Sequence, residues 1–90
     1  MDKKIAVIVP AYNEELLIKK TIDSMPEVVS EIIVINDCST DNTKSIIKEE
    51  MKNNNKINLI NLEKNSGVGF AIVKGYEEAY KKNYDVGVVM

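Results

Sequence analysis

Short apolar runs alternate with longer amphipathic segments along the chain. The runs read "KIAVIV", "EIIVIN", "KINLINL" and "VGVVM", and their β-branched residues are typical of strands. The first is almost entirely apolar, as expected of a strand that is covered on both faces of a sheet. Asn58 and Asn61 in the third favour a position nearer the edge. We therefore predict strands over residues 4–9, 31–36, 56–62 and 86–90.

Three segments between these runs carry apolar residues at helical spacing and predict helices. The first covers residues 14–25 and is followed by Pro26, the second lies within residues 39–52 after a group of capping residues, and the third covers residues 67–82. Gly75 is expected to let the third helix pack closely on the sheet. The residues expected to face the core are Leu17, Ile18, Thr21, Ile22 and Met25, then Ile46, Ile47 and Met51, then Val68, Ile72, Tyr76, Ala79 and Tyr80.

The resulting order is βαβαβαβ, which predicts a three-layer α/β fold with a parallel, Rossmann-like sheet, because each connection is long enough for a crossover helix. Open parallel sheets bind ligands beyond the carboxyl ends of their strands. Three polar segments follow such ends: "VPAYNEE", "INDCSTDNT" and "EKNSGVG". We expect these segments to lie together at one edge and to form the binding site.

Composition narrows the classes of function. Ninety residues, 44% of them apolar and 29% charged, make a single small globular domain. The net charge is −2 and every basic residue is lysine, so a nucleic-acid groove is not expected. One cysteine and no histidine exclude an internal disulfide, a Cys/His metal cluster and imidazole catalysis within the chain. No apolar stretch reaches the ~18 residues of a membrane span, and we expect a cytoplasmic location.

Four segments resemble, in order and spacing, the N-terminal part of family 2 glycosyltransferases: "VIVPAYNEE", "EIIVINDCSTDNT", "EKNSGVGFAIVKGYEEA" and "DVGVVM". The resemblance covers essentially the whole chain and is strongest to the dolichyl- and polyprenyl-phosphate hexose synthases. It implies that residues 1–90 are the nucleotide-sugar-binding half of a GT-A fold, with strand order 3-2-1-4. It further implies transfer of a hexose from a UDP- or GDP-sugar to a lipid phosphate or a saccharide, with Mg²⁺ or Mn²⁺ as cofactor.

The resemblance makes Asp37 the residue that reads the base, and it assigns Ile35 to the same site. A carboxylate only accepts hydrogen bonds, so Asp37 is suited to the imino N–H of uracil, thymine or guanine, which adenine and cytosine lack. The alternative is that Asp37 caps the second helix.

Pro10, Ala11 and Tyr12 match the family's base-contacting lip, and Glu14 matches a residue that binds ribose. Proline ends the strand without an N–H to donate, and tyrosine offers a flat face to a base. For Glu14 the alternative is a favourable negative charge at a helix N-terminus.

Lys64, Asn65 and Gly67 match a family loop near the phosphates, where backbone N–H groups at a helix start suit an anion. The alternative is a helix cap made by Asn65 or Ser66, with the glycine present for packing.

The family's acidic D-x-D metal motif and its base follow the fourth strand, and the chain has neither. The resemblance therefore implies no catalytic or metal-binding residue in these 90 residues, no sugar transfer by the chain alone, and a divalent metal in a longer parent protein. A free edge at the fourth strand favours association of copies. The alternative function is a non-catalytic module of Rossmann-like fold that binds a nucleotide or another protein.

Overall fold

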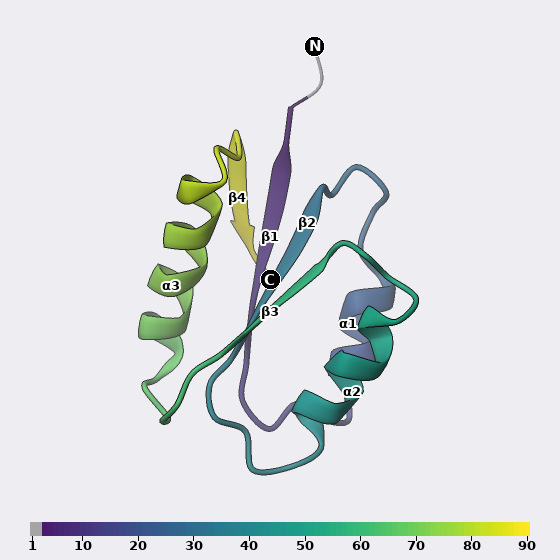
Figure 1. The fold of residues 1–90 in the computed structure, drawn as a ribbon, viewed down its shortest axis with the longest axis vertical. Coiled ribbons are helices and arrows are strands. Elements are labelled where there is room, and N and C mark those ends of the chain that lie inside the picture. The colour runs from purple at the N-terminus through teal and green to yellow at the C-terminus, as the bar shows by residue number, and fades with distance from the viewer. Residues whose placement is uncertain (1–2) are drawn as a thin grey trace.

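The computed structural model describes residues 3–90, which form one four-stranded sheet and three helices (Figure 1). The strands are β1 (Ile5–Ala11), β2 (Glu31–Asn36), β3 (Ile57–Asn61) and β4 (Val86–Val89), and the helices are α1 (Ile18–Asp23), α2 (Thr43–Met51) and α3 (Val68–Lys81). Every strand pair is parallel and the order is β3-β2-β1-β4. The predicted fold class and strand order are confirmed.

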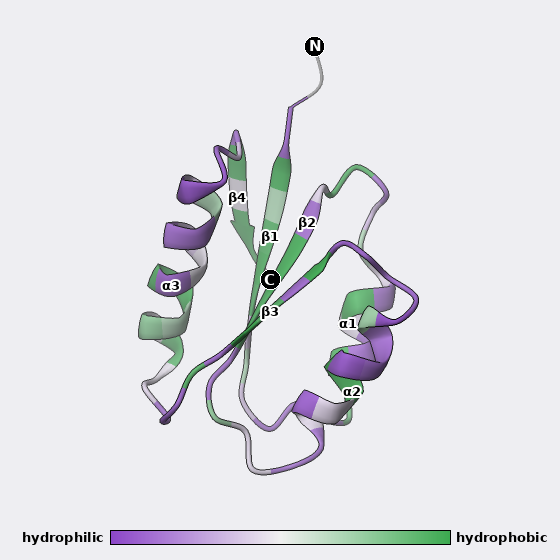
Figure 2. Cartoon of the chain, in the orientation of Figure 1, coloured by the Kyte–Doolittle hydropathy of each residue, from purple (hydrophilic) through white to green (hydrophobic). Residues whose placement is uncertain are grey.

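The sheet lies between two helical layers, with α1 and α2 on one face and α3 on the other (Figure 1). Successive residues of a strand point to opposite faces, so β1 and β2 supply two separate cores. Val7, Val9 and Val34 belong to the core under α1 and α2, whereas Ile8 and Ile33 belong to the core under α3. Figure 2 shows mostly apolar stretches along β1, β2 and β4, and polar stretches over much of α2 and the C-terminal turns of α3.

The helix α3 contacts the sheet through small side chains. Its buried residues are Ala71, Gly75 and Ala79. A Cβ built on Gly75 would lie 2.3 Å from Ile8 Cγ2, which confirms that this glycine permits close packing. Because the helix approaches so closely, only the face with the smallest residues fits against the strands.

The predicted core face of α3 was therefore wrong at three positions. Val68 and Tyr80 are 64% and 85% exposed, and Tyr76 is also exposed. Apolar periodicity located the helix correctly, but it favoured large residues where the sheet accepts only small ones. In α2, Met51 is likewise more exposed than predicted, while Ile47 is fully buried.

The first helix is shorter than predicted, because α1 begins at Ile18 and not at Glu14. The backbone N–H of Glu14 donates to Thr43 Oγ1, at the start of α2, and that of Glu15 donates to Asp41 Oδ2, in the loop after β2. Those tertiary bonds hold residues 14–17 in a turn. Leu17, predicted to face the core, is 56% exposed.

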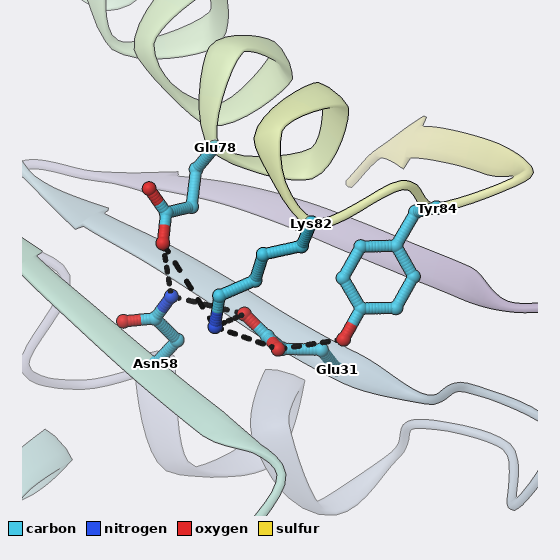
Figure 3. A network of polar contacts seen from close by, with 5 residues as sticks. All are labelled: Glu31, Asn58, Glu78, Lys82 and Tyr84. Carbon is cyan, nitrogen blue, oxygen red and sulfur yellow. Dashed lines mark hydrogen bonds and ion pairs between the residues drawn. The ribbon is translucent and has the colours of Figure 1, made fainter.

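At the amino end of β2, a polar network ties α3 to the sheet (Figure 3). Glu31 accepts hydrogen bonds from Tyr84 Oη at 2.6 Å, Lys82 Nζ at 3.0 Å and Asn58 Nδ2 at 2.9 Å. Burial raises the pKa of Glu31, but these bonds outweigh it and leave that pKa below its ordinary value. The network satisfies a partly buried carboxylate and fastens the end of α3 opposite to the polar loops.

This network predicts a specific loss of stability in alkali. Burial, and then the bond to Glu31, raises the pKa of Tyr84 to about 12 from its ordinary value of 10.0. Stabilisation from a group with a raised pKa is complete below the unfolded-state value and is lost as the pH rises through the folded-state value. We expect the urea midpoint of the natural chain to fall more between pH 10 and 12 than that of Tyr84→Phe, which has no phenol. Tyr80→Phe is the control, because Tyr80 is exposed. Equal pH profiles for the natural chain and Tyr84→Phe would contradict the expectation.

Candidate functional site

The three polar loops lie at the carboxyl edge of the sheet, as predicted (Figure 1). They are residues 12–17 after β1, residues 37–42 after β2, and residues 62–67 after β3. Parallel pairing brings them together, and side chains then join each loop to its neighbour.

A cavity of about 200 Å³ opens between these loops and the first turn of α3. Its lining residues are Pro10, Ala11, Tyr12, Glu14, Asp37, Val68 and Ala71. Five of them are residues that the sequence singled out, from two segments more than twenty positions apart. Tyr12 is 45% exposed at the cavity, whereas Asp37 is 4% exposed. The cavity therefore combines an accessible aromatic ring with a buried carboxylate.

The carboxylate of Asp37 is held by the start of α3. Asp37 Oδ1 accepts the N–H of Ser66 at 2.7 Å, and Oδ2 accepts the N–H of Gly67 at 2.9 Å. The N–H of Asp37 itself donates to the carbonyl oxygen of Ala11 at 2.8 Å. Asp37 thus binds the two residues that precede α3 and not the start of α2, and it fastens the loop after β3 to the end of β1.

This arrangement changes the interpretation of "EKNSGVG". The N–H groups of Ser66 and Gly67, which precede α3, already donate to Asp37, and the helix has no side-chain cap at Gly67. The helix cap expected from Asn65 or Ser66 is therefore not formed in the loop of residues 62–67. Gly67 has φ of +92°, a conformation that glycine adopts without strain.

The remaining predicted site residues do not line the cavity with Asp37. Lys64 lines a separate groove between β3 and α3, together with Phe70 and Lys74. Asn65 is exposed, and Ile35 is fully buried in the core under α3. The structure therefore brings the lip and Asp37 together at one cavity. Gly67 reaches Asp37 through its backbone N–H but does not line that cavity, and neither do Lys64, Asn65 and Ile35.

Sequence reasoning missed a polar chain that crosses the carboxyl edge. The N–H of Asn13 donates to Ser39 Oγ at 3.0 Å, and Ser39 Oγ donates to Asn36 Oδ1 at 2.6 Å. Asn36 Nδ2 then donates to Asn61 Oδ1 at 2.9 Å. Asn36 is only 3% exposed, so these bonds satisfy a buried amide. Its position directly after the apolar residues 32–35 of β2 was the available signal.

A second tie joins the loops after β1 and β2. Thr43, which is fully buried, donates from Oγ1 to Asp41 Oδ1 and accepts the N–H of Glu14 at 2.8 Å. Burial raises the pKa of Asp41, but the hydrogen bonds from Thr43 and from the N–H of Glu15 bring that pKa below its usual value. Only the backbone of Glu14 takes part in this tie, and the residue also lines the cavity.

Two further properties concern metals and membranes. Among residues 3–90, no three His, Cys, Asp or Glu side chains lie together as a metal site would require. In the same part of the chain, no helix has the length and apolar character that a bilayer crossing demands.

Known proteins resemble this chain in sequence and in fold. Residues 6–89 match the model of the family described as glycosyl transferase family 2. A relative from Methanococcus voltae is UDP-N-acetylglucosamine--dolichyl-phosphate N-acetylglucosaminyltransferase. It is 40% identical over an alignment of 100 positions, gaps included, which covers 97% of this chain and 40% of the relative. The chain thus spans about two fifths of that relative's length.

Solved structures share the fold. The mannosyltransferase PcManGT from Pyrobaculum calidifontis, in complex with GDP-Man and Mn²⁺, superposes with a TM-score of 0.76 at 25% identity, over 88% of this chain and 25% of that one. TarS residues 1–349 from Staphylococcus aureus, in complex with UDP, superposes with a TM-score of 0.70 at 34% identity, over 96% of this chain and 27% of that one. The family match, the parallel sheet and the lip at its carboxyl edge lead to one conclusion: the chain belongs to glycosyl transferase family 2.

Proposed function

We propose that this chain binds the nucleotide of a nucleoside diphosphate sugar, and that it is the nucleotide-binding half of a GT-A domain. The observation that carries the proposal is the cavity that joins Tyr12, Glu14 and Asp37. Whole-ligand pockets typically measure roughly 300–1,000 Å³, so a cavity of about 200 Å³ suits one ring of the ligand, with the remainder outside.

The chemistry of the cavity favours a base that has an imino N–H. A carboxylate has about four acceptor positions. Ser66 and Gly67 occupy one on each oxygen of Asp37, so further positions are left for a ligand at the cavity. Uracil and guanine offer the required donor. The structural relatives bound to UDP and to GDP-Man support the same choice.

We expect UDP and GDP to bind more tightly than ADP and CDP. A hydrogen bond to a charged group contributes about 1.5–3 kcal/mol, so the preference should reach about tenfold or more. The measurement is a titration of the 90-residue chain with each nucleotide up to millimolar nucleotide concentrations, and NMR chemical shifts report the binding. Circular dichroism and a cooperative melting curve first establish that the chain is folded. Equal affinity for all four nucleotides would reject the role of Asp37 as the base reader.

The reaction proposed for the longer protein is hexose transfer from a UDP- or GDP-sugar to a lipid phosphate or a saccharide. The Methanococcus voltae relative, whose name includes dolichyl phosphate, supports a lipid-phosphate acceptor. Residues 3–90 do not fit a metal site on their own, so we place the ligands of a catalytic Mg²⁺ or Mn²⁺ outside them. What these residues contribute is binding and orientation of the nucleotide.

Two accompanying proposals have separate tests. A cytoplasmic location is proposed because cytoplasmic nucleotide sugars are the expected donors, and cell fractionation tests it. Association of copies through the free edge of β4 stays a prediction, and sedimentation equilibrium tests it. The alternative function, a non-catalytic nucleotide-binding module, is favoured if a longer protein containing this chain binds UDP or GDP but transfers no sugar from any donor tested.

A further inference from the structure

Asn13 lies between Tyr12 and Glu14, two residues that line the cavity. Its backbone has φ of +52°, in the left-handed region. Residues with a side chain are uncommon there, and asparagine is tolerated better than most. The chain therefore makes its turn after β1 at a residue type that permits this conformation.

The side chain of Asn13 also crosses to the next loop. Its Oδ1 accepts the N–H of Thr40 at 2.8 Å and the N–H of Asp41 at 3.3 Å. The N–H of Asn13 donates to Ser39 Oγ at 3.0 Å. With the Thr40 hydroxyl, which also donates to Asn13 Oδ1 at 3.4 Å, four bonds join one residue to a loop that lies more than twenty-five positions further along the chain. Asn13 itself does not line the cavity.

We propose that Asn13 is a positioning residue, which holds Tyr12 and Glu14 at the mouth of the cavity before a nucleotide arrives. The nature of the ligand rests on the proposed function, whereas the contacts of Asn13 exist without any ligand. A lip that is already ordered loses less conformational entropy on binding, so its affinity is higher. Loosening the lip should therefore weaken binding although no ligand contact has been removed.

Three substitutions separate the left-handed backbone of Asn13 from the hydrogen bonds of its amide oxygen. Asn13→Gly keeps the left-handed backbone and removes the amide oxygen. Asn13→Ala removes the oxygen and disfavours the backbone conformation. Asn13→Asp keeps an acceptor oxygen and tolerates the left-handed region, so it is the conservative variant.

The test combines amide hydrogen exchange without nucleotide and titration with UDP and GDP. In Asn13→Gly and Asn13→Ala, we expect the amides of Thr40 and Asp41 to exchange about tenfold faster or more, and nucleotide affinity to fall by about tenfold. Asn13→Asp should keep amide protection and bind within a few fold of the natural chain.

Asn83→Ala is the matched control. Asn83 also has a left-handed backbone, with φ of +60°, but it lies in the connection between α3 and β4, at the opposite edge of the sheet. The control should lose stability as Asn13→Ala does and keep its nucleotide affinity. Equal loss of affinity in the two alanine variants would overturn the proposal, because a general loss of stability would then explain it.

Unchanged exchange and affinity in Asn13→Gly would also overturn the proposal, since the amide oxygen would have no role. If the natural chain bound neither UDP nor GDP, the proposed function would fail. The exchange rates of Thr40 and Asp41 would still decide whether Asn13 holds the lip.

Discussion

Asp37→Asn is expected to lower the free energy of unfolding by about 2–3 kcal/mol, which is roughly 10–20 °C in Tm for a domain of this size. Both carboxylate oxygens of Asp37 accept backbone N–H groups, from Ser66 and Gly67, and Asp37 is buried. An asparagine has one acceptor oxygen, so its NH₂ group would face an N–H donor at the start of α3. The same variant should also lose the preference for UDP and GDP over ADP and CDP.

The matched control for this variant is Asp85→Asn. Asp85 Oδ2 accepts a single backbone N–H, that of Lys4 at 2.7 Å, at the opposite edge of the sheet. The amide oxygen of asparagine can replace that acceptor, so the melting temperature should change little. Thermal melts and amide exchange at Ser66 and Gly67 measure the difference. Similar melts for the two variants, with the two amides still protected, would show that Asp37 does not hold α3.

Gly75→Ala is expected to destabilise the chain by about 2 kcal/mol, within the usual range for overpacking a core. The added Cβ would lie 2.3 Å from Ile8 Cγ2 and 3.2 Å from Ile8 Cβ. Ile8 is fully buried in the central strand β1, so it has little room to move. The helix would have to shift away from the sheet, and the core under α3 would loosen.

The control is the same substitution in the same helix. At Gly69 an added Cβ meets no atom within 4 Å, and the backbone is not left-handed. Gly69→Ala should therefore stabilise the chain by about 0.5–1 kcal/mol, the difference in helix propensity between glycine and alanine. Urea unfolding of both variants gives the comparison. Stabilisation by both alanines would mean that α3 does not rest on Ile8 as closely as the structure has it.

Local sequence was sufficient for the order and direction of the elements. Apolar β-branched runs such as residues 31–36, separated by helical periodicity, determined a parallel α/β sheet, because a crossover of that length leaves few other topologies. The strand order came from the resemblance to family 2 glycosyltransferases. The lip at Pro10 and Tyr12 was also visible, since a proline and an aromatic residue at the end of a strand are a local feature of the chain.

Only the tertiary structure decided which partners the polar side chains have. Asp37 accepts N–H groups from Ser66 and Gly67, about thirty residues away, and Asn13 binds a loop equally remote in sequence. The periodicity of apolar residues along the chain does not predict such contacts, because they depend on how close the loops lie in the folded structure. The same reason explains the wrong face of α3: how closely the helix approaches Ile8 favoured Ala71 and Gly75 over larger apolar residues.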